Sequence, residues 1–76
     1  MKKIDLHGMK HELVEGALIR KIEELWGSNS ELVIVTGNSS RMKAIVKNIL
    51  HDYKLEYREG DPLNTGYIKT VIIWQK

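Results

Sequence analysis

Asp5 and His7 are two residues near the N-terminus whose types and spacing could do chemistry. They occupy alternate positions in the segment Ile4-Asp5-Leu6-His7-Gly8. Side chains two residues apart on a strand point to the same side of the sheet, so a strand here would set the carboxylate beside the imidazole. A neighbouring carboxylate fixes the tautomer of an imidazole. We interpret Asp5 and His7 as a candidate general acid–base pair, compatible also with a divalent metal; a solvated pair at a strand end is the alternative.

A second candidate site is the small-residue turn that follows Val35 and leads into a helix. The first amides of a helix have no acceptor within the helix, and with the helix dipole they attract anions. We therefore predict a phosphate-binding turn, although its spacing is not that of a Walker loop. An ordinary capped turn is the alternative reading. The predicted phosphate contacts are Thr36, Gly37, Asn38, Ser39, Ser40 and Arg41.

A third feature is the polar turn Leu63-Asn64-Thr65-Gly66-Tyr67, which precedes the last apolar run. Tyr67 could stack on a base and Lys69 could contact a phosphate. Lys43 and Lys47 lie one helical turn apart and could follow a nucleic-acid backbone. The alternatives are a hairpin loop that carries an aromatic residue and a solvated helix face.

The elements that must position these residues begin with a strand over Lys3–His7, where polar and apolar residues alternate up to Gly8. Apolar residues at three- and four-residue spacing predict a helix from about His11 to Trp26. The β-branched run Leu32–Val35 is typical of a strand buried on both faces. A second amphipathic helix is expected to begin after Ser39 or Ser40 and to end near residue 52.

Two further strands are expected, over Leu55–Arg58 and Tyr67–Trp74, with Gly60-Asp61-Pro62 breaking the first. The order is then β-α-β-α-β-β, an α/β two-layer sandwich with a mixed four-stranded sheet. Two β-α-β crossovers imply a mostly parallel sheet, and a loop of about eight to ten residues would join the last, antiparallel pair. The strand ends that carry His7 and Thr36 should emerge at one edge of the sheet, where ligands of open α/β sheets bind.

The length of 76 residues allows one domain over 1–76 with one small core. The chain has no cysteine, and neither a secretory leader nor a membrane span is evident, so we expect a cytoplasmic protein with no membrane partner. Its formal net charge is +2, which permits an anionic partner without requiring one.

Taken together, the D-L-H-G segment, the run Val33-Ile34-Val35-Thr36-Gly37, the helix after it and Gly66 to Ile72 resemble a stand-alone Smr (small MutS-related) domain. The resemblance spans nearly the whole chain. It implies the sandwich also seen in the C-terminal domain of bacterial translation initiation factor three. It also implies binding of DNA or RNA, in some relatives at the ribosome, and cleavage of a phosphodiester bond.

The motifs of the family are kept unevenly. Asp5, His7 and Gly8 match the family's L-D-L-H-G motif, with Ile4 in place of the first Leu. The family's H-G-x-G motif reads Thr36-Gly37-Asn38-Ser39 here, so the second imidazole is absent. The late G-G-x-G-x-T motif keeps Gly66 and Thr70 and loses two glycines.

The expected function is therefore nucleic-acid binding, with endonuclease activity at Asp5 and His7 as a hypothesis. Cleavage needs a proton acceptor, a proton donor and stabilisation of negative charge, and the only other imidazoles are those of His11 and His51. The alternatives are a non-catalytic nucleic-acid or ribosome-binding module and a self-associating protein, the latter because of the apolar run at 71–74 and two Trp.

Overall fold

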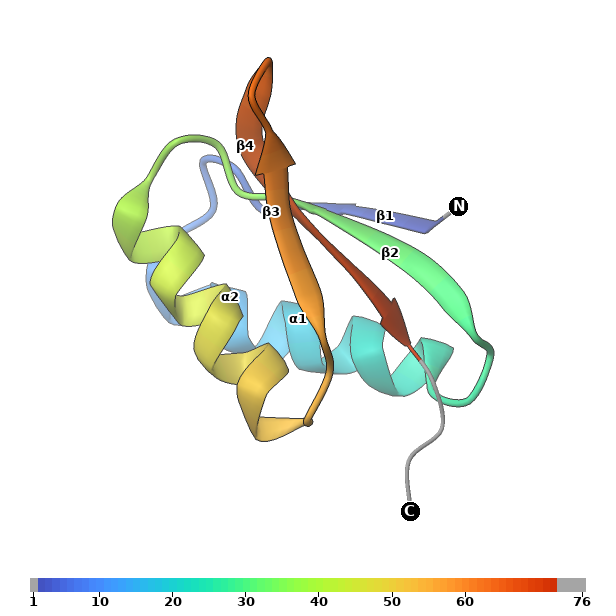
Figure 1. The fold of residues 1–76 in the computed structure, drawn as a ribbon. Coiled ribbons are helices and arrows are strands. Elements are labelled where there is room, and N and C mark those ends of the chain that lie inside the picture. The colour runs from blue at the N-terminus through green and yellow to red at the C-terminus, as the bar shows by residue number, and fades with distance from the viewer. Residues whose placement is uncertain (1, 73–76) are drawn as a thin grey trace.

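The computed structural model describes residues 2–72, apart from the side chain of Asp61. Its elements follow the predicted order β-α-β-α-β-β (Figure 1). They are β1 (Lys2–Asp5), α1 (His11–Leu25), β2 (Ser30–Val35), α2 (Ser40–Asp52), β3 (Tyr57–Asp61) and β4 (Asn64–Ile72). The prediction of a small α/β domain with a mixed four-stranded sheet and two helices is confirmed. The expected continuation of the last strand to Trp74 lies outside the described residues.

The sheet has the strand order β1-β2-β4-β3. β1 and β2 are parallel, whereas β4 is antiparallel to both of its neighbours, β2 and β3. The antiparallel pairing of the last two strands is as predicted, but the prediction of a mostly parallel sheet is wrong. The crossover through α2 does return β3 in the direction of β2. However, β4 lies between these two strands, so the second parallel pair never forms.

Both helices cover the same face of the sheet (Figure 1). Alternate side chains of the strands therefore enter one core between the sheet and the helices, and the others lie on the opposite face, which we call the open face. Burial follows this alternation: Leu32, Ile34 and Ile68 are fully buried, while their chain neighbours Val33, Val35 and Tyr67 are half-buried. The buried core consists of Leu6, Val14, Leu18, Ile22, Leu25, Leu32, Ile34, Met42, Val46, Ile49, Leu50, Leu55, Ile68 and Ile72.

The prediction that both faces of the Leu32–Val35 strand are buried is thus wrong. A continuous β-branched run is typical of a strand between two helical layers. In this chain the second layer is absent from the described residues, and two valines of β2 lie on the open face. Val33 and Val35 therefore form an apolar strip on a sheet face that neither helix covers, which the run Leu32–Val35 alone does not predict.

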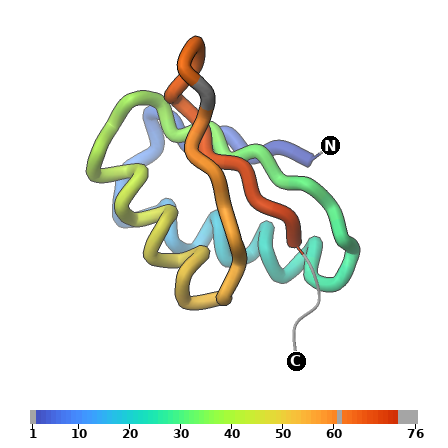
Figure 2. Tube along the Cα trace, in the orientation of Figure 1, coloured from blue at the N-terminus to red at the C-terminus, as the bar shows by residue number. Residues whose placement is uncertain are grey.

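The β3–β4 hairpin also differs from the prediction. β3 runs through Gly60 to Asp61 instead of ending at Arg58, and only Pro62 and Leu63 separate it from β4. The prediction of a long connecting loop is wrong because the pairing resumes after a bulge at Gly60, with Asp61 paired to Asn64. The hairpin tip projects beyond the ends of β1 and β2 (Figure 2), because Tyr67 is the first residue of β4 that pairs with β2.

The start of α2 is fixed by Ser39, whose Oγ accepts a hydrogen bond from the Met42 N–H at 3.1 Å. This contact decides between the two serines that the sequence offered as the N-cap. α1 begins at His11, as predicted, without a side-chain cap. Among residues 2–72, neither helix is long and apolar enough to cross a membrane.

Candidate nucleic-acid interface

Asp5 and His7 form a hydrogen-bonded pair at the end of β1. The Asp5 Oδ1 atom lies 2.9 Å from His7 Nδ1 and also accepts the His7 backbone N–H at 3.1 Å. An ionised carboxylate can only accept hydrogen bonds, so the Nδ1 atom must carry the proton. The other ring nitrogen, Nε2, is then the basic one. Both side chains are exposed, at 67% for His7 and 54% for Asp5.

The backbone around His7 explains why the pair stands at the surface. Leu6 is fully buried, and its N–H continues the β1–β2 pairing by donating to the Val35 carbonyl at 2.8 Å. The prediction that the first strand continues to His7 is wrong, because β1 ends at Asp5 and the chain turns through His7 and Gly8. The Met9 N–H closes this turn by donating to the Leu6 carbonyl. Gly8 has a φ of +80°, in the left-handed region that favours glycine. A buried leucine and a tight turn therefore hold the imidazole outward.

The pair also sets the charge of Asp5. Hydrogen bonds from the His7 side chain and backbone hold the pKa of the Asp5 carboxyl below its ordinary value of 3.8. Because this pKa is lower in the folded state, any stabilising contribution of the carboxylate is present above the ordinary pKa and is lost as the pH falls through the folded value. Asp5 is accordingly ionised at neutral pH and keeps its orienting role there.

Gly66 joins the β4 hairpin to the turn after β2. Its carbonyl accepts hydrogen bonds from the backbone N–H groups of Thr36 and Gly37, each at 2.9 Å. The Thr36 hydroxyl lies 3.2 Å from the same oxygen and 2.9 Å from the Gly37 carbonyl. Thr36 is only 2% exposed, so this hydroxyl holds two segments together instead of facing a ligand.

Gly37 stands directly beside His7. Its φ is +70°, and a Cβ atom added to it would lie 3.5 Å from the His7 Cβ atom. A Cβ added to Gly66 would in turn lie 3.5 Å from the Gly37 Cα atom. The glycines allow three segments distant in sequence to approach within van der Waals contact. The structure thus places His7 next to the turn after β2, as predicted.

Two asparagine side chains border this contact. The Asn38 Oδ1 atom accepts the Thr65 hydroxyl at 3.0 Å, which ties the turn after β2 to the hairpin. The Asn64 Oδ1 atom accepts the Gly66 N–H at 3.0 Å. With its oxygen engaged, Asn38 presents its amide N–H groups as donors.

These residues line one hollow of about 600 Å³ on the open face, which we call the open-face site. Six of the sequence-predicted residues meet there: Asp5, His7, Gly37, Asn38, Gly66 and Tyr67. Four lining residues were missed from the sequence: Lys3, Val33, Val35 and Asn64. The period-2 alternation beside Leu32 and Ile34 was the available signal for the two valines, since it places them opposite the core.

The remaining predicted residues lie elsewhere. Ser39 caps α2, while Gly8 and Ser40 are exposed outside the lining of the open-face site. Arg41 lines a neighbouring shallow hollow with Lys10 and His11, where the two helices begin. His11 and His7 therefore face different hollows. Lys69 lies on the open face, with its Nζ atom 3.9 Å from the Glu31 carboxylate.

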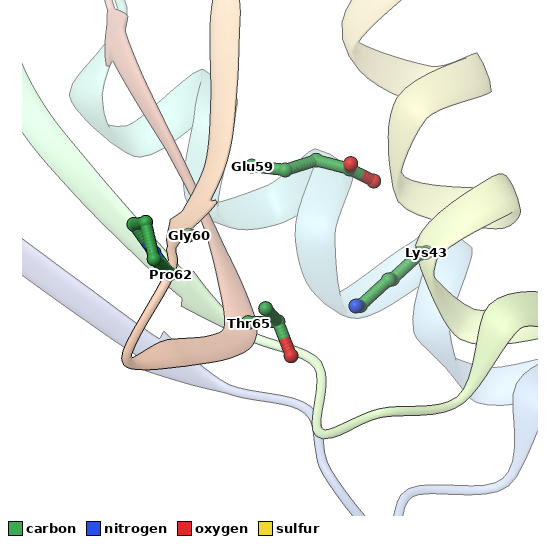
Figure 3. A pocket seen from close by; sticks show the side chains of 5 residues that line it. All are labelled: Lys43, Glu59, Gly60, Pro62 and Thr65. Carbon is green, nitrogen blue, oxygen red and sulfur yellow. The ribbon is translucent and has the colours of Figure 1, made fainter.

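Lys43 belongs to a third hollow, of about 410 Å³, between α2 and the hairpin. Figure 3 shows its side chain extending from α2 toward the hairpin, near Glu59 and Thr65. Glu59 is also ion-paired with Lys47, and hydrogen bonding to this lysine lowers the pKa of the Glu59 carboxyl. Lys43 thus flanks the hairpin on the side opposite the Asp5–His7 pair.

No three His, Asp or Glu residues within the described part of the chain converge as ligands for a metal ion. If a divalent metal binds at the open-face site, Asp5 and His7 are the ligands that this site provides. Comparisons of the chain with protein-family models, with curated proteins and with solved structures give no significant match.

Proposed function

We propose that the chain binds nucleic acid at the open-face site, with a backbone phosphate beside His7. The observation that supports this most is the convergence of three separate segments, around His7, Gly37 and Gly66, on one hollow. These are the segments for which the Smr resemblance implies a nucleic-acid role. This convergence brings Gly37, Asn38 and Gly66 within reach of a ligand that lies beside His7.

The chemistry around the hollow suits an anionic partner. Arg41 follows the N-cap of α2, where the helix dipole and the first amides favour negative charge. Lys3 lies on the rim beside the Asp5–His7 pair. The phosphate contacts would come from charged side chains and amides, which bind the backbone without reading sequence.

Binding should accordingly be sensitive to salt and to the loss of Arg41. We expect the Kd for a short oligonucleotide, measured by fluorescence anisotropy, to rise steeply between about 50 and 200 mM salt. Arg41→Ala should weaken binding and reduce the slope of log Kd against log salt by about one. The matched control is Arg20→Ala, since Arg20 is an exposed arginine of α1 that lines neither the open-face site nor the hollow of Arg41. Affinity that does not change with salt, or equal losses in both variants, would contradict the proposal.

A second candidate function is cleavage of the bound strand, and the Asp5–His7 geometry is the observation that favours it. Asp5 holds the Nδ1–H, which leaves Nε2 to accept a proton. In RNA, the 2′-hydroxyl would lose its proton to Nε2 while its oxygen forms a bond to phosphorus. The bond from phosphorus to the 5′-oxygen breaks, the 5′-oxygen takes a proton from water, and the imidazolium returns its proton to solvent. The products would be a 2′,3′-cyclic phosphate and a 5′-hydroxyl.

A further inference from the structure

We propose that the open-face site accepts an unpaired base, and hence that the preferred partner is a single-stranded nucleic acid whose base lies on Val35 and Tyr67. This inference rests on the proposed nucleic-acid binding and specifies its substrate class. It is carried by the arrangement of apolar and charged side chains in rows across the open face.

The first row is the surface on which the base would lie. Strand register places Asp5, Val35 and Tyr67 side by side across β1, β2 and β4. Val35 and Tyr67 are half-buried although neither helix covers this face, and both line the open-face site. An aromatic ring beside a flat aliphatic surface offers stacking and apolar contact to the face of a base, whatever its identity.

The second row carries positive charge. Lys3, Val33, Lys69 and Arg58 are neighbours across all four strands, two residues along from the first row. Three of these four side chains are cationic, and the Glu31 carboxylate, 3.9 Å from Lys69, offsets part of that charge. A row of cations about 7 Å from an apolar row matches a nucleotide, whose base and phosphates have opposite requirements.

The rim adds donors for the edges of a base. Asn38 presents amide N–H groups, because its oxygen is held by the Thr65 hydroxyl. The faces of a base and its Watson–Crick edge are accessible to a sheet surface only when the base is neither stacked nor paired. A duplex would present mainly phosphates to this face, so it could use the cationic row but not the apolar one.

The test uses three fluorescent probes of about ten nucleotides with equal phosphate counts per strand: a single strand, its blunt duplex and an abasic single strand. We expect the wild-type chain to bind the single strand about 10-fold or more tightly than the other two. Tyr67→Ala should weaken single-strand binding by about 5- to 100-fold and leave abasic binding unchanged. Tyr57→Ala is the matched control, because Tyr57 pairs with core-facing Thr70 and lies outside the open-face site.

The outcomes separate the two proposals. Equal affinity for all three probes would overturn the base site and leave phosphate binding intact. No binding to any probe would overturn both. The probe comparison with the wild-type chain decides the matter even if Tyr67→Ala fails to fold, and equal losses in the two tyrosine variants would also contradict the base site.

Discussion

Replacing His7 with alanine is expected to lower the rate of RNA cleavage by about 10²- to 10⁴-fold, which is the usual contribution of a general base. The imidazole is the basic group that Asp5 orients in the open-face site. The fold should be unaffected, because the His7 side chain is 67% exposed and lies outside the core. The measurement is single-turnover cleavage of an end-labelled single strand by purified protein, with circular dichroism and urea unfolding as checks on folding.

His51→Ala is the matched control, since His51 is an exposed histidine in the last turn of α2 and lines neither the open-face site nor the hollow of Arg41. It should change the cleavage rate by no more than about twofold, well below the loss expected for removal of a general base. Cleavage that survives in His7→Ala would refute the catalytic role. A wild-type chain that binds RNA without cutting it would refute cleavage and leave binding in place.

Replacing Gly60 with alanine is expected to have the largest effect on stability among the substitutions considered, lowering the free energy of unfolding by about 3 kcal/mol. An added Cβ atom would lie 2.3 Å from the Asn64 carbonyl oxygen and 2.8 Å from the Thr65 Cα atom. Both are backbone atoms, so the bulge must open before the methyl group fits. Urea unfolding followed by circular dichroism measures the loss.

Gly16→Ala provides the opposite expectation. Gly16 lies within α1, where an added Cβ atom would meet only the end of the Arg20 side chain, at 3.7 Å. Alanine is more favourable than glycine within a helix, so the free energy of unfolding of this variant should rise by up to about 1 kcal/mol. A Gly60→Ala variant as stable as the wild type would contradict the close approach of Gly60 to the Asn64 and Thr65 backbone.

The helices and the order of the elements follow from local patterns, which is why they could be predicted. The apolar spacing from residue 11 onward predicts α1, and Ser39 caps α2 through its own side chain. The direction of the strands could not be predicted in the same way. The insertion of β4 between β2 and β3 depends on pairing between segments that are distant in sequence. The run Leu32–Val35 likewise does not indicate which face of the sheet the helices cover.

The candidate site was predictable in part for the same reason. Asp5 and His7 are only two residues apart, so a local pattern could indicate their proximity, although β1 ends at Asp5 and hydrogen bonds from the His7 side chain and backbone hold the pair together. The contact of Gly66 with Thr36 and Gly37 joins segments about thirty residues apart and emerges only from the sheet order. Thr36 illustrates the limit: its hydroxyl is turned inward to a backbone carbonyl, which the residue type does not reveal.

The most direct test of the account is a titration of the ¹⁵N-labelled chain with a short single-stranded oligonucleotide at low salt, followed by amide NMR shifts. Binding at the open-face site predicts the largest shifts at His7, Asn38 and Gly66. The amide signal of His51, in the last turn of α2, should not shift. Shifts that map to the exposed faces of the helices, or no shifts at all, would contradict the central claim that this face binds nucleic acid.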